Sequence, residues 1–66
     1  MKISKRKITA LMGAKLMTQV KLAEAAGVSR ATINAALLKG SCSIPTVGKI
    51  ARALGVDPME IIKMED

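Results

Sequence analysis

Arg30 and Asn34 are the two side chains of this sequence whose types and spacing best suit the recognition of another molecule. They lie four positions apart in RATIN, so a helix would place them on one face. An arginine can bridge O6 and N7 of guanine, and an asparagine can bridge N6 and N7 of adenine. Ala31 and Ala35 share that face, and an alanine methyl can touch the thymine methyl. These four residues predict a base-reading surface, with ordinary exposed side chains as the alternative.

A sharp turn between two helices is predicted just before this face. Leu22 and Ala26 repeat at helical spacing, and Gly27 can take the positive φ that ends a helix. Ser29 is a good N-cap for a second helix. The inward stripe of that second helix consists of Ile33, Ala36 and Leu37. This pattern is a helix-turn-helix, and the outward face of its second helix usually lies in the major groove of DNA.

The charge is distributed unevenly along the chain. Eleven Lys and Arg stand against five Asp and Glu, which gives a net charge of +6. Residues 1–56 contain a single acid, Glu24, because the other four acids fall in the last ten residues. A phosphate backbone attracts such an arrangement irrespective of sequence. A lysine-rich solvated surface is the alternative.

The composition argues against an enzyme. The chain has no His and one Cys, so it lacks the ligands for a structural zinc site and an ordinary Cys-His nucleophile. Paired carboxylates and a cofactor-binding loop are also missing, so we expect no cofactor and no metal. Cys42 reads as a small buried hydrophobe, with a redox role as the less favoured alternative.

The N-terminus begins with a basic stretch followed by an apolar run over residues 8–14. This run is too short for a signal peptide or a membrane span, contains Thr9 and stops at Lys15. We therefore expect a basic amphipathic helix and no membrane association. Because the single Cys42 cannot form an internal disulfide, we expect a reducing cytoplasmic location.

The length of 66 residues predicts one domain over 1–66 with one small core, near the size at which domains need extra support or a partner. No residue is aromatic, which suits close helix packing. We predict an all-α fold, a compact five-helix bundle. Its helices are expected over residues 4–14, 19–26, 29–38 and 44–54, with a short fifth helix that Asp57 caps and Pro58 begins.

Several apolar residues near the C-terminus have two interpretations. A core of this size cannot bury every apolar side chain that the sequence offers. The residues concerned therefore belong either to the core or to a dimer interface: Leu38, Met59, Ile61, Ile62 and Met64.

Four groups of residues in a fixed order, over about residues 8–62, carry a resemblance to a known family. They are Ile8 and Leu11, Thr18-Gln19, LAEAAGVSRATI over 22–33 and KIARALGVDPMEII over 49–62. Together they resemble the phage repressor and Cro-like, or lambda-repressor-like, helix-turn-helix family. The resemblance implies sequence-specific binding of double-stranded DNA, commonly as a homodimer on a near-palindromic operator. Such a protein acts as a repressor or activator of transcription, without enzymatic chemistry.

The resemblance also implies contacts to phosphates. Gln19 is similar to a family residue that contacts a phosphate at the positive end of a helix, with a helix cap as its alternative role. The further candidates are Thr18, Lys21, Ser29, Thr32, Lys39 and Ser41. Four other cations are assigned only to the general positive field: Lys5, Arg6, Lys49 and Arg52.

The sequence departs from the family at two places. Many members have an Arg where this chain has Met12 and a Glu where it has Leu37, and the two form a partly buried ion pair. Joint replacement of such a pair by apolar residues can be neutral or stabilising, so we interpret it as a repacking. The glycine after the recognition helix comes one residue late, at Gly40, and Cys42 stands where proline is common.

Two further classes of function remain open. One is a protein-interaction module on the same scaffold, such as an antitoxin-like subunit with an unidentified protein partner. The other is a basic peptide that binds acidic membranes or nucleic acid without order. The regular placement of Gly27, Gly40 and Gly55 between helices argues against the second.

Overall fold

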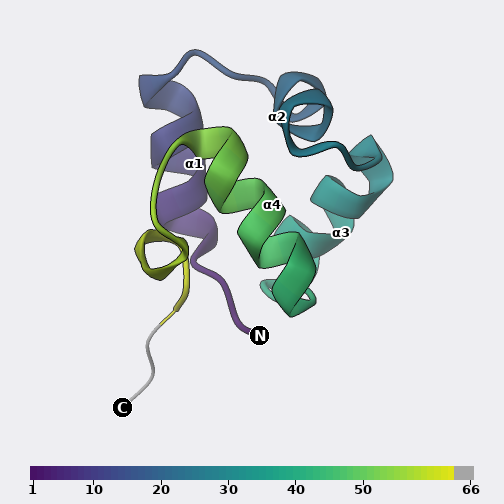
Figure 1. Ribbon diagram of the computed structural model, residues 1–66, viewed down its shortest axis with the longest axis vertical. Helices are drawn as coiled ribbons and strands as arrows, with labels where there is room; N and C mark the ends of the chain where they lie inside the picture. Colours follow the sequence, from purple (N-terminus) through teal and green to yellow (C-terminus); the bar gives the residue numbers. More distant parts are fainter. Residues whose placement is uncertain (64–66) are drawn as a thin grey trace.

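The computed structural model describes residues 1–63 of the chain and contains four α-helices. They are α1 (Lys5–Ala14), α2 (Gln19–Ala26), α3 (Arg30–Lys39) and α4 (Ile44–Leu54), followed by the single 3-10 turn η1 (Pro58–Glu60). In Figure 1, α1 lies on one side, α2 and α3 lie on the other, and α4 crosses the centre of the view. None of the helices in the described part is long and apolar enough to cross a membrane.

Each α-helix begins at a hydroxyl side chain that accepts a hydrogen bond from the backbone N–H three residues on. The four caps are Ser4, Thr18, Ser29 and Ser43. Such caps satisfy one of the N–H groups that the first turn leaves free. The predicted helices over 19–26 and 44–54 are confirmed at both ends, whereas the first and third begin one residue later than predicted, because Ser4 and Ser29 remain outside as caps.

The predicted fifth helix is wrong. Asp57 does cap the segment, since its Oδ1 accepts a hydrogen bond from Met59 N–H at 2.9 Å, but only one 3-10 turn follows. The chain then leaves the helical path because its backbone pairs elsewhere: the Ile61 carbonyl accepts a hydrogen bond from Ser4 N–H, and Ile62 forms an antiparallel bridge with Ile3.

The core is entirely aliphatic. Its six largest fully buried side chains are Ile8, Leu22, Ile33, Ile50, Leu54 and Ile61. Met12 and Leu37, the residues that stand in place of the family's ion pair, are 9% and 7% exposed and belong to the same cluster. No side-chain polar atom buried within residues 1–63 lacks a hydrogen-bond partner. This core therefore holds the helices without any buried charge.

The N-terminal segment, residues 1–4, ties two distant parts of the chain together, which the sequence did not predict. Ile3 N–H donates to the Gly40 carbonyl at 2.9 Å, and Ser4 N–H donates to the Ile61 carbonyl at 2.7 Å. Ile3 is 2% exposed and joins the core. The end of α3 and the segment after η1 are thus fixed to the start of α1.

Leu16 has a left-handed backbone with φ of 55°, and it is the one non-glycine residue of the described chain with positive φ. It ends α1 through hydrogen bonds from Leu16 N–H to Gly13 O and from Met17 N–H to Met12 O. Gly27 and Gly55 end α2 and α4 with the same pair of bonds. A side chain is strained in this conformation.

We expect Leu16→Gly to stabilise the fold by about 0.5–1 kcal/mol. Glycine removes the backbone strain at this position, and this gain exceeds the cost of the greater conformational entropy that glycine gives the unfolded chain. Leu16 is 89% exposed, so little buried area is lost. Thermal unfolding followed by circular dichroism measures the change. Leu16→Ala is the control: it removes most of the side chain but keeps Cβ, and an equal gain in this variant would contradict backbone strain as the cause.

Candidate nucleic-acid interface

The helix-turn-helix is formed by α2 and α3, which pack against each other, and α2 also packs against α4. Gly27 has a φ of 73°, and the Val28 N–H donates a hydrogen bond to the Ala23 carbonyl at 3.1 Å. Ser29 then caps α3. The turn therefore has the residues and the conformation that the sequence predicts, and it fixes the direction in which α3 leaves.

The predicted base-reading residues lie together on the outer face of α3. Ile33 is fully buried and fixes the rotation of the helix about its axis. The four residues Arg30, Ala31, Asn34 and Ala35 are all exposed. Leu38 follows one turn later on the same stripe and is 73% exposed, so it lies outside the core. The structure thus brings an Arg, an Asn and three apolar side chains onto one accessible surface.

Two of the phosphate candidates form a pair at the start of α3. The Ser29 Oγ accepts from Thr32 N–H at 3.1 Å and lies 2.8 Å from the Thr32 Oγ1. Thr18 plays the same role at the start of α2, accepting from Lys21 N–H at 3.2 Å. Ser29 and Thr18 are helix caps first. One hydroxyl of the Ser29–Thr32 pair donates to the other, so the pair keeps one O–H for an anion, and Thr18 keeps its own.

The phosphate candidates fall into three places. Thr18, Gln19 and Lys21 gather at the positive end of α2, where Gln19 is half-buried and the other two are exposed. The Ser29–Thr32 pair lies at the start of α3. Lys39 and Ser41 lie at the opposite end of α3, roughly 15 Å away by the rise of a ten-residue helix. The structure does not bring these three groups into one cluster.

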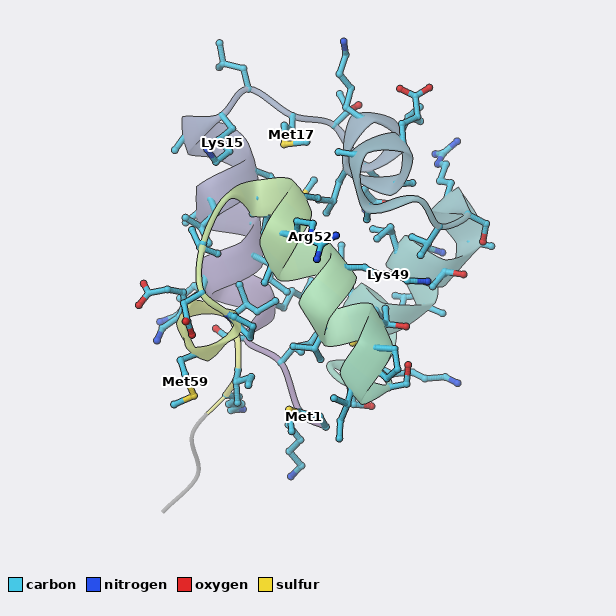
Figure 2. The ribbon with its side chains drawn as sticks, in the orientation of Figure 1. Met1, Lys15, Met17, Lys49, Arg52 and Met59 are labelled. Atoms are coloured by element: carbon cyan, nitrogen blue, oxygen red, sulfur yellow. The ribbon has the colours of Figure 1, made fainter. Side chains whose placement is uncertain are left out.

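The cations assigned to the general field divide between two helices. Lys49 and Arg52 project from α4, as Figure 2 shows, and both are exposed. Lys5 and Arg6 form the first turn of α1. No acidic residue lies in the first turn of any of the four α-helices. The positive ends of these helices thus have no acidic side chain of their own helix beside them.

The residues predicted for a dimer interface are not all accessible. Ile61 is 0% exposed, so its side chain belongs to the core and its assignment to an interface is corrected. The correction follows from the pairing of its backbone with Ser4, which turns the side chain inward. Met59 is 56% exposed and Ile62 is half-buried. Met64 lies outside the described residues.

Cys42 is half-buried in the loop after α3 and packs against the core. Burial raises the pKa of its thiol, and the N-terminal ammonium, which donates to the Cys42 carbonyl at 3.0 Å, opposes that rise in part. A raised pKa disfavours the reactive thiolate.

Residues 1–63 contain no group of three or more His, Cys, Asp or Glu that could hold a metal ion.

Comparison with solved structures gives one relative of similar size. The chain is 28% identical to the restriction-modification controller protein C.AhdI from Aeromonas hydrophila, with a TM-score of 0.74 over 85% of this chain and 86% of that one. Two structures of PhpD, one native with cadmium atoms and one with cadmium and hydroethylphosphonate, match with a TM-score of 0.82. They are 24% identical, and this chain spans 14% of their length, so they show the fold alone.

The family comparison covers almost the whole sequence. No curated protein matches the chain. Residues 7–66, however, match the family of Cro/C1-type HTH DNA-binding domains. This match includes α2, the turn at Gly27 and the exposed face of α3 described above, and it confirms the resemblance found in the sequence. The chain therefore belongs to the Cro/C1-type helix-turn-helix DNA-binding domain family.

Proposed function

We propose that this chain is a sequence-specific regulator of transcription, a single domain over residues 1–66 that acts on double-stranded DNA in the cytoplasm. The observation that carries the proposal is the face of α3, where exposed Arg30 and Asn34 flank the fully buried Ile33. Burial of Ile33 fixes which side of the helix is offered to a ligand. The family supplies the class of ligand, and the excess of basic residues fits it.

In this proposal α3 lies in the major groove and reads bases directly. Arg30 bridges O6 and N7 of a guanine, and Asn34 bridges N6 and N7 of an adenine. Ala31 and Ala35 approach thymine methyl groups. Both polar side chains are long enough to leave the helix surface, whereas the alanines let the backbone come close to the bases.

Phosphate contacts at the start of α2 and at the end of α3 hold the recognition helix in register. Gln19 and Lys21, at the positive end of α2, contact phosphates of one DNA strand, and Lys39 and Ser41 contact phosphates of the other strand. These contacts carry little sequence information but supply much of the affinity. The domain thereby separates affinity from specificity.

We also propose that two copies bind a near-palindromic operator as a homodimer. Support comes from the small core, which leaves apolar side chains accessible near the C-terminus: Met59 is 56% exposed and Ile62 is half-buried. A two-fold dimer would place its recognition helices in successive major grooves, with half-sites about 10 bp apart.

Selection of bound sequences from a random duplex library tests this function. We expect a motif with two-fold symmetry, and sedimentation on that duplex should give two chains per duplex. An asymmetric motif with one chain bound would contradict the dimer and leave the regulator in place. Enrichment of no motif would favour a protein-interaction module instead. Because the sequence has no aromatic residue, protein concentration must come from amino-acid analysis rather than near-ultraviolet absorbance.

A further inference from the structure

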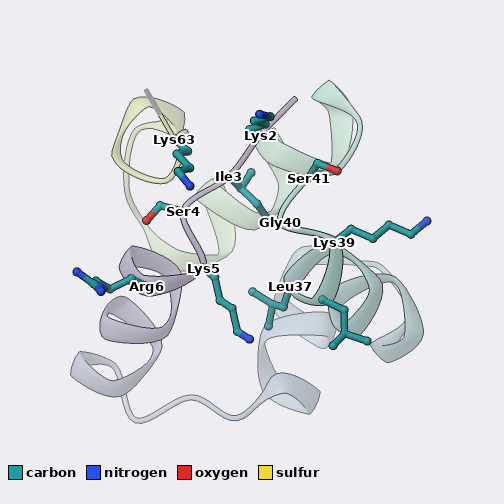
Figure 3. Close-up of a pocket in the computed structure, with 11 residues that line it drawn as sticks. Lys2, Ile3, Ser4, Lys5, Arg6, Leu37, Lys39, Gly40, Ser41 and Lys63 are labelled. Carbon is teal, nitrogen blue, oxygen red and sulfur yellow. The ribbon is translucent and has the colours of Figure 1, made fainter. Parts of the chain in front are cut away.

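A basic groove lies beside the end of α3, outside the base-reading face. It has a volume of about 710 Å³ and runs between residues 2–6, residues 37–41 and Lys63 (Figure 3). Five of its lining residues are cations and none is an acid: Lys2, Lys5, Arg6, Lys39 and Lys63. A concave surface of one charge sign focuses the field and concentrates counter-ions. The groove therefore suits an anionic ligand.

The backbone brings these cations together from distant parts of the sequence. Lys63 N–H donates to the Lys2 carbonyl at 3.1 Å, and Lys2 forms an antiparallel bridge with Ser41. Lys5 follows directly, in the first turn of α1. Main-chain pairing and the core residue Ile3 thus place cations that are remote in sequence around one groove.

The groove continues the proposed DNA surface. Leu38, the last exposed residue of the α3 stripe, lines the groove, as do Lys39 and Ser41 from the phosphate candidates. A duplex held by α3 in its major groove has a phosphate backbone that passes the end of this helix. In Figure 3, Lys39 extends outward from the end of α3, and Lys5 extends into the space between α1 and α3.

We propose that the basic groove binds the phosphate backbone of DNA that flanks the bases read by α3, with Lys5 and Lys63 as its contacts. This inference rests on the proposed function and adds a phosphate site on the N-terminal and C-terminal segments. Lys2 also lines the groove but already interacts within the protein, so it is not assigned a contact. The other anion to consider is the acidic surface of a second copy, where Asp57 and Glu60 are exposed.

The test compares two lengths of the duplex enriched by the selection. One is trimmed to the motif, and the other is extended by roughly 5 bp, half a helical turn, on each side. The variant Lys5→Gln/Lys63→Gln removes two exposed charges and leaves the backbone pairing in place. Affinity is measured over a range of salt concentrations. Each lost phosphate contact reduces the slope of log affinity against log salt by about 0.9 per chain.

We expect the wild-type protein to have a steeper slope on the extended duplex than on the trimmed one. The variant should lose about 1.8 units of slope per chain on the extended duplex and little on the trimmed one. Lys15→Gln/Arg52→Gln is the control with equal charge, because both of its cations lie outside the groove lining. This control should keep the difference between the two duplexes. Circular dichroism verifies that each variant folds. If the double variant does not fold, the single variants Lys5→Gln and Lys63→Gln are measured in its place.

Three results would overturn the proposal. Equal slopes for wild type and variant on the extended duplex would remove the groove as a DNA site while the proposed function stands. If the double variant altered only the oligomeric state of the protein in the absence of DNA, and not its affinity for either duplex, the groove would be assigned to contact with a second copy. Failure of the wild-type protein to bind either duplex would remove the proposed function together with this inference.

Discussion

Shortening Ile61 to alanine is expected to lower the free energy of unfolding by about 2–5 kcal/mol. Ile61 is 0% exposed and packs in the core cluster although it lies after the last helix. Its removal leaves a cavity that the helices fill only in part. A domain of this size has a stability of only several kcal/mol, so a large share of the molecules would unfold at moderate temperature.

Urea unfolding followed by far-ultraviolet circular dichroism measures this loss, because the sequence has no aromatic residue for fluorescence. Met59→Ala is the matched control: Met59 is 56% exposed on the same segment, and its change should stay within about 0.5 kcal/mol. Equal effects of the two substitutions would mean that the segment after η1 does not pack as described.

Replacing Arg30 by alanine is expected to cost about 1–3 kcal/mol of binding free energy on the selected site and to relax selectivity at one base position. Arg30 is the first residue of α3 and is exposed, so its loss leaves the core intact. Competition between the selected duplex and duplexes changed at single positions measures both effects.

Lys39→Ala provides the contrast. It should weaken all duplexes about equally and reduce the slope of log affinity against log salt by roughly one unit, because one phosphate contact is lost. If Arg30→Ala also lowered affinity equally for selected and random duplexes, α3 would not be reading bases through that side chain.

Local signals explain which parts of the fold could be predicted. The hydroxyl caps and the glycines at the ends of α2 and α4 act within a few residues of the helix they limit, and both helices are confirmed at their predicted bounds. The α3 face followed from the same short-range pattern, since burial of Ile33 fixes its neighbours. A 3.6-residue period is enough to separate the two sides of a helix.

Long-range pairing explains what could not be predicted. Ile3 and Ile61 enter the core through backbone bonds with residues that are remote in sequence. Leu16 takes a conformation that its type disfavours, so its role as a helix end has no local signal. The basic groove could not be predicted either, because Lys5 and Lys63 line one groove only after the two ends of the chain have paired.

The bridge between Ile3 and Ile62 closes nearly the whole chain into one loop, and this has a kinetic consequence. Helices α2 and α3 form from contacts between close neighbours in sequence, whereas loop-closure entropy opposes the bridge until the helices have packed. We therefore expect the pairing of the two ends to form late in folding. Substitutions that weaken it are expected to accelerate unfolding and to leave the folding rate nearly unchanged. On this expectation, the few residues that join the ends set the lifetime of the folded domain.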